Sequence, residues 1–418
     1  MENIINSKLE ENINKGCDFI FNKLYYPKTK MIYDFLYTEN MEDATDIFPT
    51  PDEIQHSVPN PCGWGTGMED ATLNLGTMLE ATENRFKATG DIAMKKYFDM
   101  MCEGLITTGT VAPEKGFIAR CVAPCDGKSI YIDSSRDQYT HWVFAGHVIL
   151  NSELADDDQK ETVKEVLVNI ARKAERDVTE ENGGYMLRLD GKKGRVSQMM
   201  GKELGPHELQ RLPMIYAAAY EASKDNYWLA KYHKIRDELL IKAENNYTAE
   251  FCRNVAENFG YVYGSYQAQY SLRLLYDIES DENYKKRYLK LMQTVAESSE
   301  ISIDKAYANI DLYNWEQPFY PHWRNISAAY FGYGDGYGYY VPSMAYGESE
   351  SLEKVRKNLR NTGETFIIMC LCPEYKISDD LKEKFAEIIE KTNFNNIKSY
   401  WPVVICGAFY ALNANEAI

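Results

Sequence analysis

Apolar residues recur at helical spacing through most of the chain, and the predicted helices come in pairs. Residues 68–88 carry Leu73, Met78 and Leu79 at such spacing and are followed by a second helix over 92–105. Within each pair a short turn joins a less charged helix to a helix rich in Lys and Glu, so the first is predicted to be buried and the second to face solvent. The further pairs are 137–153 with 156–178, 206–223 with 226–246, and 264–279 with 281–299.

Alternating buried and exposed helices, in about six pairs, predict a closed ring of helical hairpins. The expected fold is therefore all-α, an (α/α)6 toroid. No Pro/Ser-rich linker interrupts the chain, so residues 1–418 are expected to form a single catalytic domain. Segments 116–122 and 184–191 alternate in polarity and predict short β-hairpins at one mouth of the ring. The alternative is an open α-solenoid, which irregular repeat lengths disfavour.

Polar, aromatic-rich segments precede the buried helices at intervals of roughly 60–70 residues. In a toroid the loops that enter the inner helices gather at one end, so these segments are predicted to converge on one site. The segments are 62–70, 134–142, 205–211, 261–269 and 315–324, with a weaker sixth at 399–402.

Two of these segments place an aspartate at the start of a buried helix. Asp70, Asn74 and Thr77 form one polar stripe at i, i+4 and i+7 on an otherwise apolar helix. Asp137 stands in the same relation to His141, one turn later. A carboxylate in a first helical turn is also favoured by the helix dipole, which is the structural alternative for Asp70. The polar stripe favours a functional role, and Asp137 is predicted to be the principal catalytic carboxylate.

The third segment adds Glu208, which lies one turn from Arg211 and beside His207. An ordinary helix-surface ion pair is the alternative for these residues. Catalytic roles are predicted for Asp137, Asp70 and Glu208. Arginines bind carboxylates through two parallel hydrogen bonds, so Arg120, Arg136, Arg211 and Arg324 are candidates for a substrate carboxylate. The full set of predicted substrate-binding residues is Trp64, Glu69, Asn74, Arg120, Arg136, His141, Trp142, His207, Arg211, Trp315, His322 and Arg324.

The net charge of -17 argues against nucleic acid or an anionic membrane as a partner. No apolar run approaches the length of a membrane span and no signal peptide is recognised, so a cytoplasmic protein is expected. The nine cysteines are irregularly spaced and are predicted to be free thiols. Neither they nor the six dispersed histidines have metal-binding spacing, so no metal and no other cofactor is predicted. The expected partner is an oligosaccharide substrate, and a homo-oligomer is left open.

Two carboxylates in an acidic, aromatic and arginine-bearing funnel suit glycoside chemistry. One protonated carboxyl donates to the leaving oxygen, and the other activates water or attacks the anomeric carbon. Burial and a like-charged neighbour raise the pKa of the acid.

The hairpin units, with Asp70 and Asp137 at the starts of successive inner helices, resemble the six-hairpin glycosidases. Within that group the unsaturated glucuronyl and rhamnogalacturonyl hydrolases and related uronidases are most similar. The resemblance implies removal of a terminal uronic acid without a metal. It places the acid/base role on Asp137, which would protonate a vinyl ether and help to activate water, with Asp70 assisting. The chain departs from the pattern after Asp137, where Gln-Tyr-Thr-His-Trp replaces an apolar run. Two alternatives therefore remain: the substrate sugar is saturated or unsaturated, and the catalytic acid is Asp137 or Glu208.

Three hypotheses follow. The first is an exo-acting glycoside hydrolase that removes a terminal glucuronyl or galacturonyl unit, saturated or unsaturated, from oligosaccharides. The second is a sugar epimerase or isomerase on the same barrel, in which His141 and His207 move a proton next to a carbonyl. The third is a helical-repeat binding protein without catalysis, whose grooves would lie on the outside of the ring.

Overall fold

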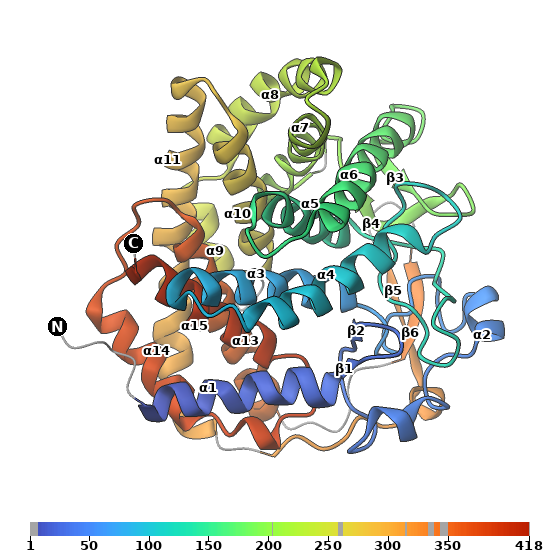
Figure 1. The fold of residues 1–418 in the computed structure, drawn as a ribbon, viewed down its shortest axis with the longest axis vertical. Coiled ribbons are helices and arrows are strands. Elements are labelled where there is room, and N and C mark those ends of the chain that lie inside the picture. The colour runs from blue at the N-terminus through green and yellow to red at the C-terminus, as the bar shows by residue number, and fades with distance from the viewer. Residues whose placement is uncertain are drawn as a thin grey trace.

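The computed structural model describes residues 7–202, 204–257, 262–313, 316–332, 338–342 and 350–417. In this part of the chain six helices form an inner ring and six lie outside them (Figure 1). The inner helices are α3 (Ala71–Thr89), α5 (Arg136–Asn151), α7 (Arg211–Ser223), α10 (Val262–Ile278), α13 (Glu350–Leu371) and α15 (Pro402–Ala417). The outer helices are α1 (Ser7–Phe19), α4 (Met94–Thr110), α6 (Asp157–Asp177), α8 (Asn226–Asn246), α11 (Glu282–Ser299) and α14 (Asp379–Lys391).

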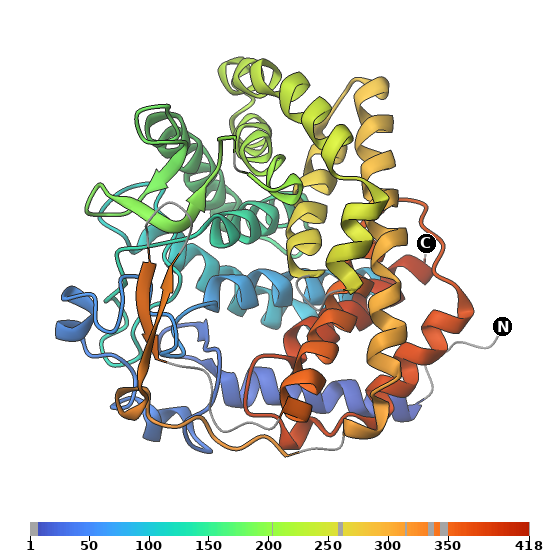
Figure 2. The ribbon, with the colours of Figure 1, turned by 180° about the vertical axis from the view of Figure 1, so that it is seen from behind.

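The inner helices contact one another in sequence order, and the ring closes. Helix α3 packs on α5, α5 on α7, α7 on α10, α10 on α13 and α13 on α15, and α15 returns to α3. The reverse view in Figure 2 shows the same circuit from behind. This closure confirms the all-α (α/α)6 toroid and excludes the open solenoid. The short helices α2 (Pro51–Gln55), α9 (Ala249–Glu257) and α12 (Ile301–Tyr307) lie in the connections.

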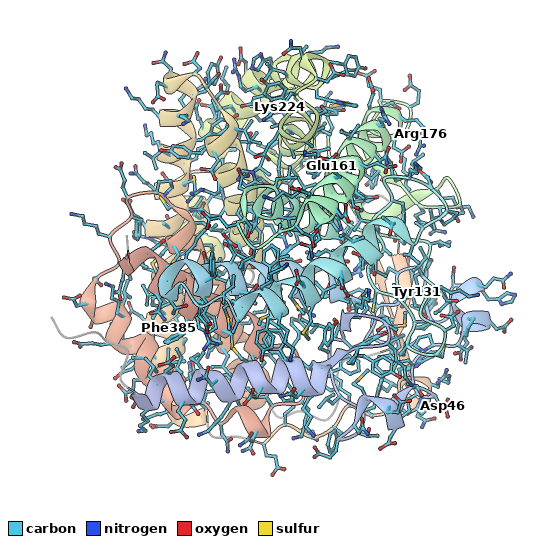
Figure 3. All side chains as sticks on the ribbon, in the orientation of Figure 1. Asp46, Tyr131, Glu161, Arg176, Lys224 and Phe385 are labelled. Atoms are coloured by element: carbon cyan, nitrogen blue, oxygen red, sulfur yellow. The ribbon has the colours of Figure 1, made fainter. Side chains whose placement is uncertain are left out.

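The division into inner and outer helices follows from charge. In α3 every residue from Ala71 to Glu83 is buried, and over that stretch the helix carries no Lys or Arg and only two carboxylates, Glu80 and Glu83. The outer helix α6 begins at a capping box made by Asp156 and Gln159. Its buried face carries Val163 and Ile170, whereas Glu161 and Arg176 point to solvent (Figure 3). An inner helix is thus apolar around most of its circumference and an outer helix on one face only.

Within the part of the chain that the structure describes, three two-stranded antiparallel ribbons lie against the ring. They are β1 (Tyr25–Tyr26) with β2 (Met31–Ile32), β3 (Tyr185–Leu187) with β4 (Lys193–Gln198), and β5 (Ala328–Gly332) with β6 (Gly338–Pro342). Figure 1 shows the strands on one side of the molecule and both chain termini on the other. Helix α3 touches β2 and helix α5 touches β4, so the strand side holds the N-terminal ends of these inner helices.

The β3–β4 ribbon confirms the hairpin predicted at 184–191, but the strand predicted at 116–122 is wrong. Those residues form an irregular buried segment that packs against α3 and α4. Ala119 donates its backbone N–H to the carbonyl of Thr108 in α4, and the carbonyl of Arg120 accepts from the N–H of Thr72 in α3. The alternating pattern reflects burial against helices, which satisfy the backbone groups that a partner strand would otherwise bind.

Within the residues that the structure describes, no helix is both long enough and apolar enough to cross a membrane.

Candidate active site

Each inner helix contributes a polar side chain to one region at the strand side of the ring. Asp70 precedes α3, Asp137 and Arg211 begin α5 and α7, Tyr263 begins α10, Arg360 lies midway along α13, and Tyr400 precedes α15. Burial raises the pKa of the Tyr263 hydroxyl well above its ordinary value, and the charges of Asp137 and Asp70 add to this effect. Tyr400 is affected in the same way by burial and by Asp70. The predicted convergence is therefore present for the segments that enter α3, α5, α7, α10 and α15, whereas the residue contributed by α13, Arg360, lies outside every predicted segment.

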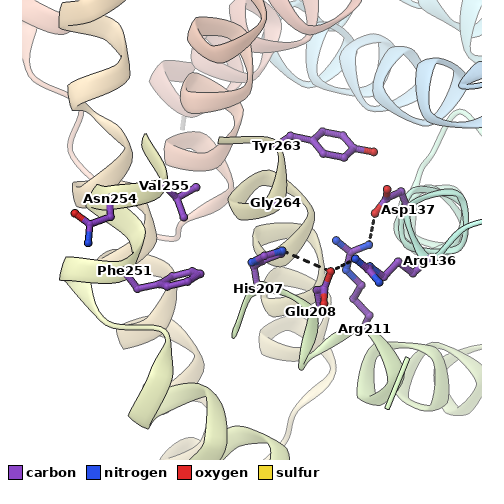
Figure 4. A pocket seen from close by; sticks show the side chains of 10 residues that line it. All are labelled: Arg136, Asp137, His207, Glu208, Arg211, Phe251, Asn254, Val255, Tyr263 and Gly264. Carbon is purple, nitrogen blue, oxygen red and sulfur yellow. Dashed lines mark hydrogen bonds and ion pairs between the residues drawn. The ribbon is translucent and has the colours of Figure 1, made fainter. Parts of the chain in front are cut away.

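A cavity of about 390 Å³ opens in this region. One wall is charged and the other is largely apolar and aromatic (Figure 4). The charged wall consists of Arg136, Asp137, Glu208 and Arg211, and the other wall of Phe251, Asn254, Val255, Tyr263 and Gly264. His207 lies between them, stacked on Phe251 and 3.6 Å from Glu208. A flat apolar face opposite hydrogen-bonding groups is the arrangement that accommodates a small polar ring compound.

Two ion pairs hold the charged wall together. Arg211, whose side chain is 3% exposed, binds Asp137, and Arg136 binds Glu208. Burial alone would raise the pKa of Asp137, but Arg211 and Arg136 outweigh burial and lower that pKa to about 2. Glu208 also has a lowered pKa, because His207 and the same two arginines overcome burial. Both carboxylates are therefore ionised at neutral pH.

A second group of carboxyls, formed by Asp34, Glu69 and Asp70, has raised pKa values. Burial raises the pKa of Glu69 to about 8, and the neighbouring Asp70 adds to the rise. Burial also raises the pKa of Asp70; Arg120 and Arg360 oppose the rise, and Asp137 adds to it. The pKa of Asp34 is raised well above its ordinary value by burial and by Asp70 and Glu69. Three adjacent carboxyls of this kind share protons, and at neutral pH the group retains at least one.

Backbone contacts explain why these carboxyls lie so close together. Asp34 accepts hydrogen bonds from the backbone N–H groups of Glu69, at 2.7 Å, and Asp70, at 3.0 Å. Asp70 occupies the N-cap position of α3 but makes no side-chain cap hydrogen bond. Instead its Oδ1 accepts from Gln138 Nε2 at 3.2 Å and lies 4.0 Å from Arg120 Nη1. The Asp70 carboxyl is thus directed towards α5, the helix of Asp137, rather than used as a helix cap.

The arginines retain free hydrogen-bonding capacity. Among the described residues, the Nε atoms of Arg120, Arg136 and Arg211 are buried and have no hydrogen-bond partner. A buried N–H group without a partner costs free energy, and an anionic or hydroxyl-rich ligand would satisfy it. This donor set suits an organic ligand. No group of three or more His, Cys, Asp or Glu side chains among the described residues is arranged to hold a metal ion.

Several predicted site residues lie at or beside the cavity, and others lie elsewhere. The residues at or beside it are Glu69, Asp70, Arg120, Arg136, Asp137, His207, Glu208 and Arg211. Asn74 is buried beneath them, with its Nδ2 3.5 Å from Asp34 Oδ1. The indole ring of Trp64 stacks under the guanidinium of Arg195, 3.4 Å from the ring centroid. Arg195 also lowers the pKa of Glu69 and so lies near the carboxyl group.

His141 and Trp142 are both buried in the ring. His141 is 2% exposed, and burial lowers the pKa of its imidazole to about 3. Gln267 Nε2 and the backbone carbonyl oxygen of Asp137 lie 3.0 and 3.3 Å from its Nδ1. Trp142 points about 100° around α5 from His141, and its indole N–H donates to the carbonyl of Leu105 at 2.8 Å. Neither ring lines the cavity.

The fifth polar segment lies apart from the cavity wall. Arg324 pairs with Glu53 and donates to the carbonyl of Ile47 at 2.9 Å, and His322 lies beside it. These contacts attach the segment to the loop before α3. Trp315 lies outside the described residues.

Sequence reasoning missed Asp34, Tyr263 and Arg360. Asp34 is a lone charge within the apolar stretch Met31–Leu36, which is a signal that the sequence contains. Arg360 follows a run of Lys and Arg at the start of its helix and looks like one more exposed base. In the structure its guanidinium lies 4.4 Å from the Tyr263 ring centroid, and its Nε donates to Glu364 at 2.6 Å.

Comparisons with known proteins find distant structural likenesses only. No protein-family model matches the sequence, and no curated protein matches it. The cellobiose 2-epimerase from Spirochaeta thermophila matches with a TM-score of 0.47 and 11% identity, covering 99% of this chain and 98% of the other. A sugar epimerase from a ruminal bacterium matches with a TM-score of 0.44 and 10% identity, covering 97% and 98%. Both act on carbohydrates, and neither is a uronidase, so the uronidase resemblance gains no support from them. Both likenesses are too distant to assign a reaction to this chain.

Proposed function

We propose that this protein is a carbohydrate-active enzyme that cleaves the glycosidic bond of a terminal acidic sugar. One observation carries the proposal: Asp70 and Asp137, on adjacent inner helices, have pKa values shifted in opposite directions. Two carboxyls whose surroundings separate their pKa values supply one proton donor and one anion at the same pH, as glycoside cleavage requires.

The pKa values reverse the roles that the resemblance implies. Asp137 has a pKa of about 2 and is an anion at neutral pH, so it is a poor proton donor. Asp70 belongs to the proton-retaining group with Glu69 and Asp34, and its side chain is 22% exposed. Asp70 is therefore assigned the role of the acid, which protonates the leaving oxygen. Asp137 stabilises positive charge developing at the anomeric carbon, or orients the water that attacks it.

The preference for an acidic sugar rests on the arginines. Arg136 and Arg211 each use part of the guanidinium on an ion pair within the wall, and each has an unpartnered Nε. A uronate carboxylate bound there would satisfy these donors, while Phe251 and Tyr263 would cover a face of the sugar ring. Saturated and unsaturated uronic acids both fit this description.

The test is hydrolysis of a panel of oligosaccharides ending in saturated or Δ4,5-unsaturated uronic acid, with neutral-sugar analogues as controls. Release of the terminal acidic sugar is expected. The Asp70→Asn variant should lose at least about 100-fold in kcat, since removal of a general acid costs about 10²–10⁴ in rate, and should bind substrate normally. Asp237→Asn, a matched change on outer helix α8, should leave kcat unaltered. A panel without turnover, or full activity in Asp70→Asn, would refute the proposal.

A sugar epimerase is the second candidate, and His207 is the observation that favours it. Its ring lines the cavity, is 29% exposed and lies 3.6 Å from Glu208. The partner proposed with it, His141, is buried with a pKa of about 3, so the second proton carrier would come from the Asp34, Glu69 and Asp70 group, in which the pKa of Glu69 is about 8. This candidate predicts deuterium incorporation from heavy water into a reducing sugar without release of a second sugar. Substrate recovered without label would exclude it.

A further inference from the structure

A second cavity, of about 440 Å³, lies far from the candidate active site, between α1, α3, α4 and α15. Cys17, Arg85 and Tyr410 line it, and the exposed Asp18 lies at its rim. Arg85 lies fifteen residues beyond Asp70 along α3, which places it roughly 22 Å away at 1.5 Å per residue. The cavity therefore belongs to the opposite end of the ring, and the proposed reaction does not use it.

Cys17, on α1, lies in a polar and cationic corner of this cavity. Its Sγ is 3.6 Å from the Tyr410 hydroxyl. Arg85 Nη1 donates to the same hydroxyl at 3.0 Å, and the Arg85 guanidinium lies 5.1 Å from the Tyr410 ring centroid. A cation and a hydroxyl near a sulfur atom stabilise its thiolate form.

Cys406, on α15, reaches the same turn of α1. Its Sγ lies 3.9 Å from the carbonyl oxygen of Ile13, one helical turn before Cys17. A Cβ atom placed on Gly16 would lie only 3.0 Å from this sulfur, so the glycine allows the close approach. The two sulfur atoms therefore lie against the same turn of α1, one from an inner helix and one from an outer helix, and each shifts the pKa of the other.

The two sulfur atoms have different chemical character. The hydrogen bond with Cys406 is the largest influence on Cys17 and, together with Tyr410 and Arg85, lowers the pKa of that thiol despite burial. Burial and the neighbouring Cys17 raise the pKa of Cys406 well above its ordinary value. Cys17 is thus the nucleophile, and Cys406 keeps its proton.

We propose that Cys17 and Cys406 form an oxidisable dithiol site that reacts with a small peroxide. The Cys17 thiolate attacks one peroxide oxygen; the O–O bond breaks, hydroxide leaves, and Cys17 becomes a sulfenic acid. The Cys406 sulfur then attacks the Cys17 sulfur, losing its proton as water leaves, and an S–S bond forms. Two thiols are oxidised and one peroxide is reduced. The disulfide ties α1 to α15 across a loop of almost the whole chain.

The experiment treats the full-length reduced protein with graded hydrogen peroxide, blocks the remaining thiols and identifies modified peptides by mass spectrometry. Cys125, the exposed thiol, is the internal reference, and buried Cys102, whose pKa burial raises to about 12, is the negative reference. A Cys17–Cys406 linked peptide is expected at peroxide concentrations that leave Cys102 reduced, together with a higher Tm. In Cys406→Ser, a sulfenic-acid trap should label Cys17 instead.

Two results would overturn the proposal. One is oxidation of Cys17 no faster than that of Cys102 while Cys125 reacts fully. The other is oxidation of Cys17 without any linkage to Cys406 in the wild-type protein. Cys102→Ser serves as the matched variant and should retain the linked peptide. Because the readout is covalent and independent of turnover, failure here leaves the proposed glycosidic reaction untouched.

Discussion

Replacing Arg211 with Met should destabilise the protein strongly at neutral pH. The Arg211 side chain is 3% exposed and pairs with Asp137, which is 21% exposed. The pKa of Asp137 falls from its ordinary 3.8 to about 2, with Arg211 the largest influence that lowers it. At 1.36 kcal/mol per pH unit, this shift corresponds to about 2 kcal/mol of stability. Because the folded pKa is depressed, that stability is present above pH 4 and is lost as the pH falls towards 2.

Without Arg211, burial is the largest influence on Asp137 and raises its pKa, and Arg136 and Arg120 oppose it. Removing one partner of a buried pair costs about 3–5 kcal/mol, more than the pair itself contributes, because a charge is left without its partner. The pKa of Asp137 in the variant should lie above its value in the unfolded chain. The stability deficit of Arg211→Met should therefore be smallest at acidic pH, where Asp137 is protonated, and should grow as the pH rises through the new pKa.

Urea unfolding followed by circular dichroism at pH 5 and pH 7 measures both effects. Arg287→Met is the matched control, because Arg287 makes hydrogen bonds of 2.7 and 2.8 Å to Glu244 on the outer helices, with side chains 30% and 34% exposed. An exposed pair of this kind contributes at most about 1 kcal/mol. The electrostatic account of the site is wrong if Arg211→Met lowers the free energy of unfolding at pH 7 no more than Arg287→Met does. It is also wrong if the loss of free energy in Arg211→Met is not smaller at pH 5 than at pH 7.

Three further predictions concern stability and packing. His147 lies between Glu221, at 2.8 Å, and Asp277, at 3.4 Å, and these carboxylates overcome burial and raise its pKa to about 9. Its contribution to stability is therefore complete below pH 6.5 and lost as the pH rises through 9, so the Tm advantage of wild type over His147→Gln should disappear by pH 10. Gly116→Ala should lower the free energy of unfolding, measured with urea, by at least about 2 kcal/mol. Gly116 has φ +84, and a Cβ there would lie 2.1 Å from the Asn169 carbonyl oxygen. An unchanged urea midpoint would contradict this prediction. Gly264→Ala places a Cβ 3.0 Å from His207 Cδ2 and should displace the His207 ring. The His207 NMR resonances should therefore shift while the Tm stays nearly constant. Unshifted resonances would show that the cavity wall adapts elsewhere.

The fold was predictable because it depends on properties that a sequence displays directly. Helical periodicity and the contrast between uncharged and charged helices separate inner from outer positions, and α3 and α6 follow that rule. In the segment 116–122 an alternation in polarity does not correspond to a strand. Alternation along a chain reports which side chains are buried, and a helix surface can bury them as well as a second strand can. Its backbone partners in α3 and α4 are set by tertiary packing, which no local pattern reveals.

The placement of candidate residues was predictable where they lie at the starts of inner helices, as Asp70 and Asp137 do. Prediction failed where the direction of a side chain decides its role. His141 and Trp142 follow each other in α5, and the rotation of about 100° between successive residues separates a ring that packs within the barrel from one that faces α4. Arg360 was missed because its neighbours in sequence are basic, although its neighbours in space are Tyr263 and Glu364.

The roles of the carboxyls are the property that sequence alone cannot supply. Asp70 and Asp137 occupy equivalent places at the starts of adjacent inner helices, yet one pKa is raised and the other lowered. The difference arises from their neighbours. Arg211 and Arg136 outweigh burial at Asp137, whereas burial prevails at Asp70 over Arg120 and Arg360. Asp34, which accepts from the backbone N–H groups of Glu69 and Asp70, places a third carboxyl with a raised pKa beside Asp70. An Asp34→Asn variant should therefore lower the pKa of the Asp70 group and move the alkaline limb of the pH–rate profile to lower pH without changing the acidic limb. A profile in which only the acidic limb moves would instead return the proton-donor role to Asp137.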